Sequence, residues 1–103
     1  MAASGIQPDL NRAREPLEAY PLENLRMVGT LAQNRAVFAL IKTSDNNLFR
    51  VKTGNYLGQN FGVITQIDEG NVKLKEIVQD GAGDWTERVS TLQLQEEQEV
   101  AKK

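Results

Sequence analysis

The first clear pattern in the chain is an alternation of apolar and polar residues that begins at Leu25. Leu25, Met27 and Leu31 fall in one phase, which predicts a strand with one face in the core. Residues 36–41 are apolar at every position, and their β-branched and aromatic members favour a strand covered on both faces. Asn34, between the two stretches, tolerates the left-handed backbone conformation of a tight turn. The sequence therefore predicts a β-hairpin whose second strand lies at the centre of the fold.

Further along the chain, short apolar stretches alternate with turns rich in glycine, asparagine and aspartate. Each stretch has the length and the period of a strand. The predicted strands span residues 48–53, 61–68, 72–78 and 85–94. Together with the hairpin they predict an all-β fold, a small antiparallel β-sandwich or half-open barrel of about six to seven short strands. A sheet this small leaves edges exposed, and an exposed edge can pair with another chain.

Two of these strands have an irregular phase. The alternation slips at Glu76, which we interpret as a β-bulge. In the last strand Trp85 and Val89 share one phase and Leu92 has the other. We therefore expect either a bulge near Ser90 or a strand that crosses from one sheet to the other.

Three segments are expected along the chain. Residues 1–15 hold too few large apolar groups to offset the roughly 1–2 kcal/mol per residue that backbone ordering costs, so this N-terminal segment is expected to be disordered. Residues 16–95 form the β-domain. Residues 96–103, rich in Glu, Gln and Lys, are expected to be a solvated C-terminal tail.

The stretch from 14 to 22 precedes the hairpin and carries two prolines. Prolines disfavour a helix interior, so we expect this collar to be extended. Leu17, Tyr20 and Leu22 give it apolar groups with which to dock. Two interpretations stay open: the collar packs on the domain's own core, or it is an arm that binds a partner.

The composition excludes most catalytic and metal-binding classes. The chain has 103 residues, no Cys and no His, so thiol chemistry, Cys-ligated metal and the commonest general base are absent. No recognisable nucleophile elbow, phosphate loop or calcium loop is present. We therefore expect no enzyme activity, no cofactor and no metal. The net charge is −2, which disfavours nucleic acid because phosphate-binding surfaces usually carry a basic excess.

One alternative binding function remains from the residues alone. Trp85 and Tyr56 could stack a base or a sugar, beside a stripe of Lys and Arg on neighbouring strands. Under this alternative hypothesis the chain is a small β-barrel that binds nucleic acid or polysaccharide. The competing interpretation is structural: Trp85 closes one end of the core, Tyr56 or Leu57 inserts into it from the glycine-flanked corner, and the basic residues lie on the wet face of a sheet. The stripe would consist of Arg50, Lys52, Lys73 and Lys75.

Several segments of the chain, taken in order, resemble those of a known family. The ordered set of segments at 14–31, 36–41, 51–62, 72–78 and 85–88, followed by Leu92 and Leu94, is similar to the C-terminal periplasmic domain of the PilP family, inner-membrane lipoproteins of type IV pilus assembly. The glycine corner of 51–62, Val-Lys-Thr-Gly-Asn-Tyr-Leu-Gly-Gln-Asn-Phe-Gly, is the longest piece. A weaker likeness is to the homology region of GspC-type secretion proteins.

The resemblance implies a fold, a cellular location and partners. The fold is a small β-sandwich, and the location is the periplasm, with an inner-membrane anchor through a lipidated cysteine that this chain lacks. We therefore expect the chain to be an excised domain, monomeric alone. The implied function is that of a non-enzymatic adaptor. It links the inner-membrane PilN–PilO subcomplex to the N-terminal domains of the outer-membrane secretin PilQ.

Two sets of partner-binding residues follow as expectations. An early strand after a proline-rich collar often ends at a sheet edge, so we expect the first strand to meet the secretin and to display Arg26, Val28 and Thr30 outward. The residues assigned to that contact are Leu25, Arg26, Val28 and Thr30. In the family the segment before the β-domain contacts PilN–PilO, which implies a second contact through Arg14, Leu17 and Tyr20.

Overall fold

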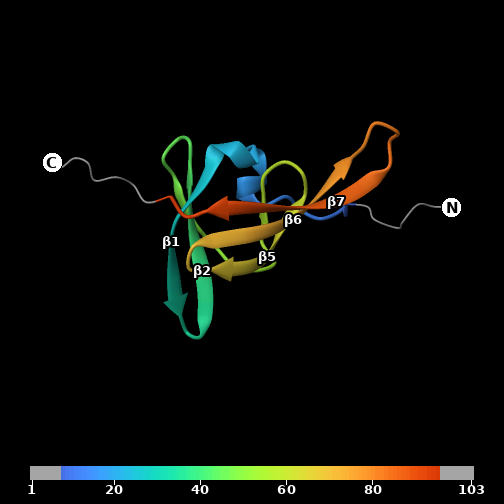
Figure 1. The fold of residues 1–103 in the computed structure, drawn as a ribbon. Helices are drawn as coiled ribbons and strands as arrows, with labels where there is room; N and C mark the ends of the chain where they lie inside the picture. The colour runs from blue at the N-terminus through green and yellow to red at the C-terminus, as the bar shows by residue number, and fades with distance from the viewer. Residues whose placement is uncertain (1–7, 96–103) are drawn as a thin grey trace.

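The computed structural model describes residues 8–95 and shows two antiparallel sheets packed into a curled half-barrel (Figure 1). The fold class predicted from the sequence is confirmed. The first sheet has the order β1-β2-β3 and the second the order β4-β5-β6-β7. The strands are β1 (Leu25–Gln33), β2 (Ala36–Thr43), β3 (Leu48–Val51), β4 (Tyr56–Leu57), β5 (Gly62–Asp68), β6 (Asn71–Gln79) and β7 (Trp85–Gln93).

The predicted hairpin from residue 25 to 43 forms as expected. The strands β1 and β2 pair antiparallel, from Leu25 opposite Thr43 to Gln33 opposite Ala36. Asn34 and Arg35 make the turn with φ angles of 53° and 68°, the left-handed pair that matches the twist of a two-residue hairpin. Because β2 also pairs with β3, it is the central strand of its sheet.

Within β1 the predicted phase is wrong beyond Met27. Met27 pairs with Ile41 and Gly29 with Leu40, so Val28 is an extra residue in a β-bulge. A bulge moves every later side chain to the other face of the sheet. Leu31 therefore lies opposite Phe38, away from the core face, and is 39% exposed.

In the second sheet the expected bulge at Glu76 is also wrong. The strands β6 and β7 pair without a shift over their whole length, and the register shift lies in β5, between Ile64 and Gln66. Glu76 instead continues the phase of Val72 and Leu74 and is buried with them. The apparent change of phase in the sequence pattern is therefore a carboxylate that occupies a core position.

The last strand shows neither a bulge near Ser90 nor a crossing between the sheets. The strand β7 stays beside β6, with Leu92 opposite Val72 on the core face. Val89 lies opposite Lys75 on the other face and is 71% exposed. Trp85 shares that outer phase and packs edge-on against Phe61, with ring centroids 6.2 Å apart. The expectation that Trp85 closes one end of the core is therefore wrong, because it is not among the core residues.

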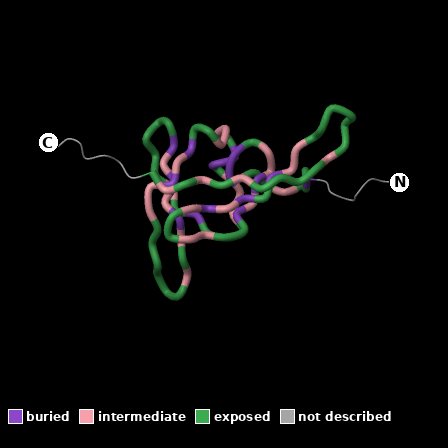
Figure 2. Tube along the Cα trace, in the orientation of Figure 1, coloured by how far each residue is buried: buried purple, intermediate pink, exposed green. Residues whose placement is uncertain are grey.

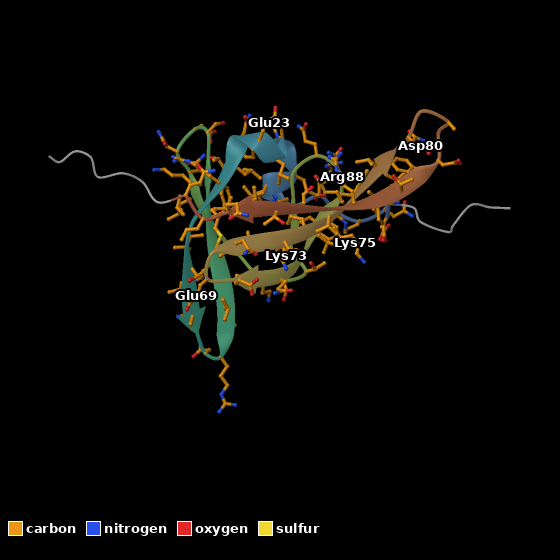
Figure 3. The ribbon with its side chains drawn as sticks, in the orientation of Figure 1. Glu23, Glu69, Lys73, Lys75, Asp80 and Arg88 are labelled. Carbon is orange, nitrogen blue, oxygen red and sulfur yellow. The ribbon has the colours of Figure 1, made fainter. Side chains whose placement is uncertain are left out.

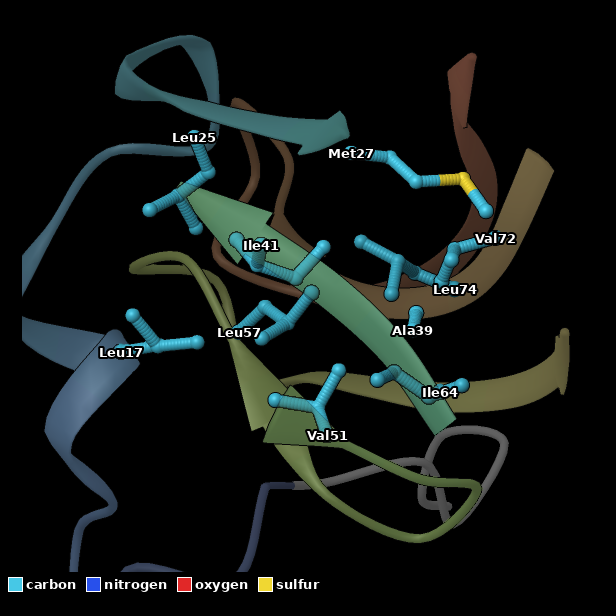
Figure 4. Close-up of a cluster of buried hydrophobic side chains, with 10 residues drawn as sticks. All are labelled: Leu17, Leu25, Met27, Ala39, Ile41, Val51, Leu57, Ile64, Val72 and Leu74. Carbon is cyan, nitrogen blue, oxygen red and sulfur yellow. The ribbon is translucent and has the colours of Figure 1, made fainter. Parts of the chain in front are cut away.

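The core lies between the two sheets, and the hairpin ends and turns are exposed (Figure 2). Leu57 is fully buried there, as the glycine corner predicted, whereas Tyr56 is only partly buried. Both sheets and the collar contribute side chains, so the core holds the three parts together (Figure 4). Its members are Leu17, Leu25, Met27, Ala39, Ile41, Val51, Leu57, Ile64, Val72 and Leu74.

The collar is not extended, as the prolines suggested, but forms two single-turn 3₁₀ helices, η1 (Pro16–Ala19) and η2 (Leu22–Asn24). Pro16 occupies the first turn of η1, where its missing N–H costs nothing and its fixed φ favours the helix. Within residues 8–95 there is no helix long and apolar enough to cross a membrane. Residues 1–7 of the segment 1–15 that is expected to be disordered, and the expected solvated tail at 96–103, lie outside the described residues.

Candidate protein-binding surfaces

One edge of the first sheet is open along most of β1. The strand order places β1 at that edge, as the sequence predicted. Within residues 8–95, the backbone pairing on its outer side is a parallel bridge from Met27 to Leu94 and a hydrogen bond of 2.8 Å from Gln95 N to Met27 O. The β1–β2 hairpin extends beyond the second sheet (Figure 1). A free strand edge of this kind can accept a strand from another chain.

The four residues assigned to the secretin contact lie in different environments. Leu25 is only 4% exposed and belongs to the core. Arg26 and Val28 are half-buried, and Thr30 is exposed. The expectation that Arg26, Val28 and Thr30 point the same way is wrong, because the bulge at Val28 puts Thr30 opposite Ala39, on the core face, while Arg26 lies opposite Lys42. Their role in binding stays a prediction.

The end of the β1–β2 hairpin also presents apolar groups that sequence reasoning missed, Leu31 on β1 and Val37 on β2, which lie on opposite faces of the sheet. Leu31 and Val37 are 39% and 48% exposed, near the end of the hairpin. Leu31 was assigned to the core only because the bulge was not foreseen. Beside it, the Arg50 guanidinium lies 5.0 Å from the centre of the Phe38 ring and donates a hydrogen bond of 3.3 Å to Gln33.

An ion pair ties the segment before the collar to η1, and Leu17 ties the collar to the domain core. The Arg12 guanidinium donates to both oxygens of Glu18, at 3.0 and 2.7 Å, in the two-bond geometry that makes such pairs strong. Glu18 is buried and also accepts a hydrogen bond from Glu15 N of 2.8 Å. Glu15 in turn accepts from Tyr56 N at 3.0 Å. Although residues 8–15 form no helix or strand, Arg12 anchors them to η1; the expected boundary at residue 16 stays a prediction.

This ion pair predicts a pH dependence of stability. The hydrogen bonds from Arg12 hold the pKa of Glu18 below its ordinary value of 4.5. A lowered folded-state pKa contributes stability that is complete above pH 4.5 and is lost as the pH falls through the folded value. We expect Glu18→Gln to flatten the decline in the free energy of unfolding between pH 6 and pH 3, measured by urea denaturation. Parallel declines in both proteins would show that the pair does not carry this dependence.

The three collar residues assigned to PilN–PilO also differ in accessibility. Leu17 is 3% exposed and packs in the domain's own core, so its side chain is not available to a partner. Tyr20 is half-buried, and its hydroxyl donates to Asp45 at 3.2 Å. The pKa of Asp45 is lowered, chiefly because the Thr43 hydroxyl donates a hydrogen bond to it. Arg14 is exposed, with its guanidinium 6.0 Å from the Phe61 ring centre.

The basic stripe of the alternative function does not form. Arg50 lies on β3 in the first sheet, whereas Lys73 and Lys75 lie on β6 in the second. Lys75 is within 4.0 Å of Glu87, which reduces its positive potential. The Arg12 guanidinium lies 3.4 Å from the centre of the Tyr56 ring, so one face of this ring is already occupied. Within residues 8–95 no cluster of carboxylates could hold a metal ion.

Comparison with known proteins identifies the family. The family model described as "Pilus assembly protein, PilP" matches residues 1–94. The chain belongs to the PilP family. A curated relative, the type IV pilus inner membrane component PilP of Pseudomonas aeruginosa, is 43% identical over 91 residues. Those residues make up 88% of this chain but only 52% of that relative, so the chain spans about half of its length.

Solved structures of PilP domains have the same fold. A domain from the type IV pilus biogenesis lipoprotein PilP of Pseudomonas aeruginosa superposes with a TM-score of 0.78 at 42% identity, over 85% of this chain and 100% of that one. A solution structure of PilP from the same organism gives 0.77 at 40% identity, over 95% of this chain and 87% of that one. The PilP resemblance of the sequence is therefore confirmed.

Proposed function

We propose that this PilP-family domain is a non-enzymatic periplasmic adaptor of the type IV pilus machine. In this proposal it links the PilN–PilO subcomplex of the inner membrane to the N-terminal periplasmic domains of the secretin PilQ. In this proposal the protein is held at the inner membrane by a lipid anchor. Family membership supports the pilus role, since the family consists of pilus assembly proteins.

The observation that carries the secretin contact is the open edge of β1. A strand of the partner would pair with the backbone from Val28 to Gln33, and side chains beside that edge would set specificity. Leu31 and Val37 supply exposed apolar area at this end of the hairpin, and Arg26, Val28 and Thr30 line the same strand. One such interface is small, so repetition around the secretin ring would strengthen it.

The second contact, to PilN–PilO, is proposed to lie on the collar side. Arg14 and Tyr20 are the two predicted residues there that keep exposed surface. The collar, which forms η1 and η2, leads directly into the start of β1, so the two partners would approach neighbouring parts of the domain. A nucleic-acid or polysaccharide function is not favoured, because the aromatic and basic groups it needs do not form one surface.

The proposed contact at the β1 edge is tested by comparing two substitutions that each introduce a negative charge. We expect Leu31→Asp to weaken binding of a PilQ N-terminal fragment by about tenfold, the loss that burying roughly half of one leucine side chain accounts for. Val89→Asp is the matched control, because Val89 is an exposed apolar residue on β7 of the other sheet. Affinities are measured by calorimetry. Equal losses in both variants, or a loss only in Val89→Asp, would refute the edge contact.

A further inference from the structure

A groove separate from the β1 edge lies between the collar and the second sheet. Its volume is about 620 Å³, within the usual range of ligand-binding clefts. Collar residues 21–23 and loop residues 59–60 form one side, and Glu76, Arg88, Ser90 and Leu92 form the other. Figure 3 shows Glu23 on the collar and Arg88 on β7 below it, while Asp80 lies away at the end of the β6–β7 hairpin.

Glu76 supplies a buried acceptor to this groove. Its Oε1 accepts hydrogen bonds from Arg88 Nε at 2.9 Å and from Ser90 Oγ at 2.5 Å. Its Oε2 is buried and has no hydrogen-bond partner among residues 8–95. The side chain is only 1% exposed. A buried carboxylate oxygen without a hydrogen bond raises the free energy of the folded protein. A hydrogen bond from a bound donor to this oxygen therefore contributes more to binding than the same bond would in water.

The charges that line the groove favour a cation. Two carboxylates, Glu76 on its floor and Glu23 on its rim, are opposed by one guanidinium, that of Arg88. Arg88 already uses its Nε on Glu76, and its side chain is 54% exposed, so it can shift as a guest enters. An anion would meet two negative groups here.

The rest of the lining favours arginine over a bare ammonium. Pro21, Leu22 and Leu92 provide apolar walls, against which an aliphatic stem and a weakly hydrated guanidinium can pack. We propose that this groove binds an arginine side chain of a protein partner, whose guanidinium donates to Glu76 Oε2. The volume accommodates that side chain together with its neighbours in a short peptide. The site does not depend on the proposed contact at β1.

The test titrates the ¹⁵N-labelled domain with two peptides, acetyl-Leu-Arg-Leu-amide and the same peptide with citrulline in place of arginine. Citrulline has nearly the same shape but no charge. We expect saturable shifts at the amides of Glu76, Arg88 and Ser90 with the arginine peptide, and binding about tenfold weaker with citrulline, the loss of one charge-assisted hydrogen bond. We expect the same loss of arginine-peptide affinity in Glu76→Gln.

Glu23→Gln is the control for the rim. It removes the same charge from an exposed position, and we expect a smaller loss than in Glu76→Gln. Equal affinity for arginine and citrulline in the wild-type domain would overturn the proposal, since it would mean that the groove is only apolar. That comparison needs no variant and holds even if Glu76→Gln alters the fold. A loss confined to Glu23→Gln would also overturn it.

Discussion

Leu57→Ala is expected to destabilise the domain by about 3 kcal/mol, within the range of leucine truncations in well-packed cores. Leu57 is fully buried and lies on the short strand β4, where its carbonyl oxygen is 2.9 Å from the position that a Cβ on Gly62 would take. The backbone around it is therefore close-packed and has little room to collapse into a cavity. The free energy of unfolding is measured by urea denaturation.

The control for this prediction is Leu48→Ala. Leu48 is 59% exposed at the start of β3, so its truncation is expected to change stability by less than about 0.5 kcal/mol. Similar effects of the two variants would contradict the placement of the core. Leu57 lies in the glycine-flanked corner, so this result also tests the prediction that this corner inserts a side chain into the core.

Arg12→Ala is expected to cost about 3 kcal/mol, near the lower end of what breaking a buried ion pair costs. The Glu18 carboxylate is fully buried, whereas the Arg12 side chain is 18% exposed. Removing the guanidinium leaves Glu18 with the single hydrogen bond from Glu15 N and also uncovers the Tyr56 ring. The loss is expected at pH 7, where the carboxylate is charged, and is expected to shrink near pH 3.

Arg14→Ala is the matched control, since it removes an exposed arginine two residues away and is expected to be nearly neutral. The double variant Arg12→Ala, Glu18→Ala separates the pair from its surroundings. If the Glu18 carboxylate destabilises the domain when Arg12 is absent, the double variant loses less stability than the sum of the losses in Arg12→Ala and Glu18→Ala. Equal stability of Arg12→Ala and Arg14→Ala would show that this pair does not stabilise the domain.

The sequence predicted the architecture well because its strands are marked by a period of two and by turn residues with distinct backbone preferences. The hairpin at Asn34 and the burial of Leu57 are examples. The phase error in β6 arises because a pattern of apolar residues assumes that charged groups are solvated. Glu76 is buried because Arg88, its partner, lies opposite on β7, and a contact across strands is not visible in a local window.

The bulge in β1 was hidden for a related reason. Gly29 follows the extra residue Val28 and has no side chain to reveal the change of face, so Leu31 still matched the apparent period. The sequence was sufficient to place β1 at an edge, but it could not tell which of its residues stay accessible. Leu25 and Leu17, both assigned to partner contacts, are instead buried in the core.

We propose that the secretin adds a strand to β1, and one NMR titration can show this directly. The ¹⁵N-labelled domain is titrated with an unlabelled N-terminal periplasmic fragment of PilQ. We predict shifts or line broadening concentrated on the amides of the β1–β2 hairpin from Val28 to Val37, with the β6–β7 hairpin unaffected. An unchanged spectrum, or changes confined to β6 and β7, would contradict strand addition at β1.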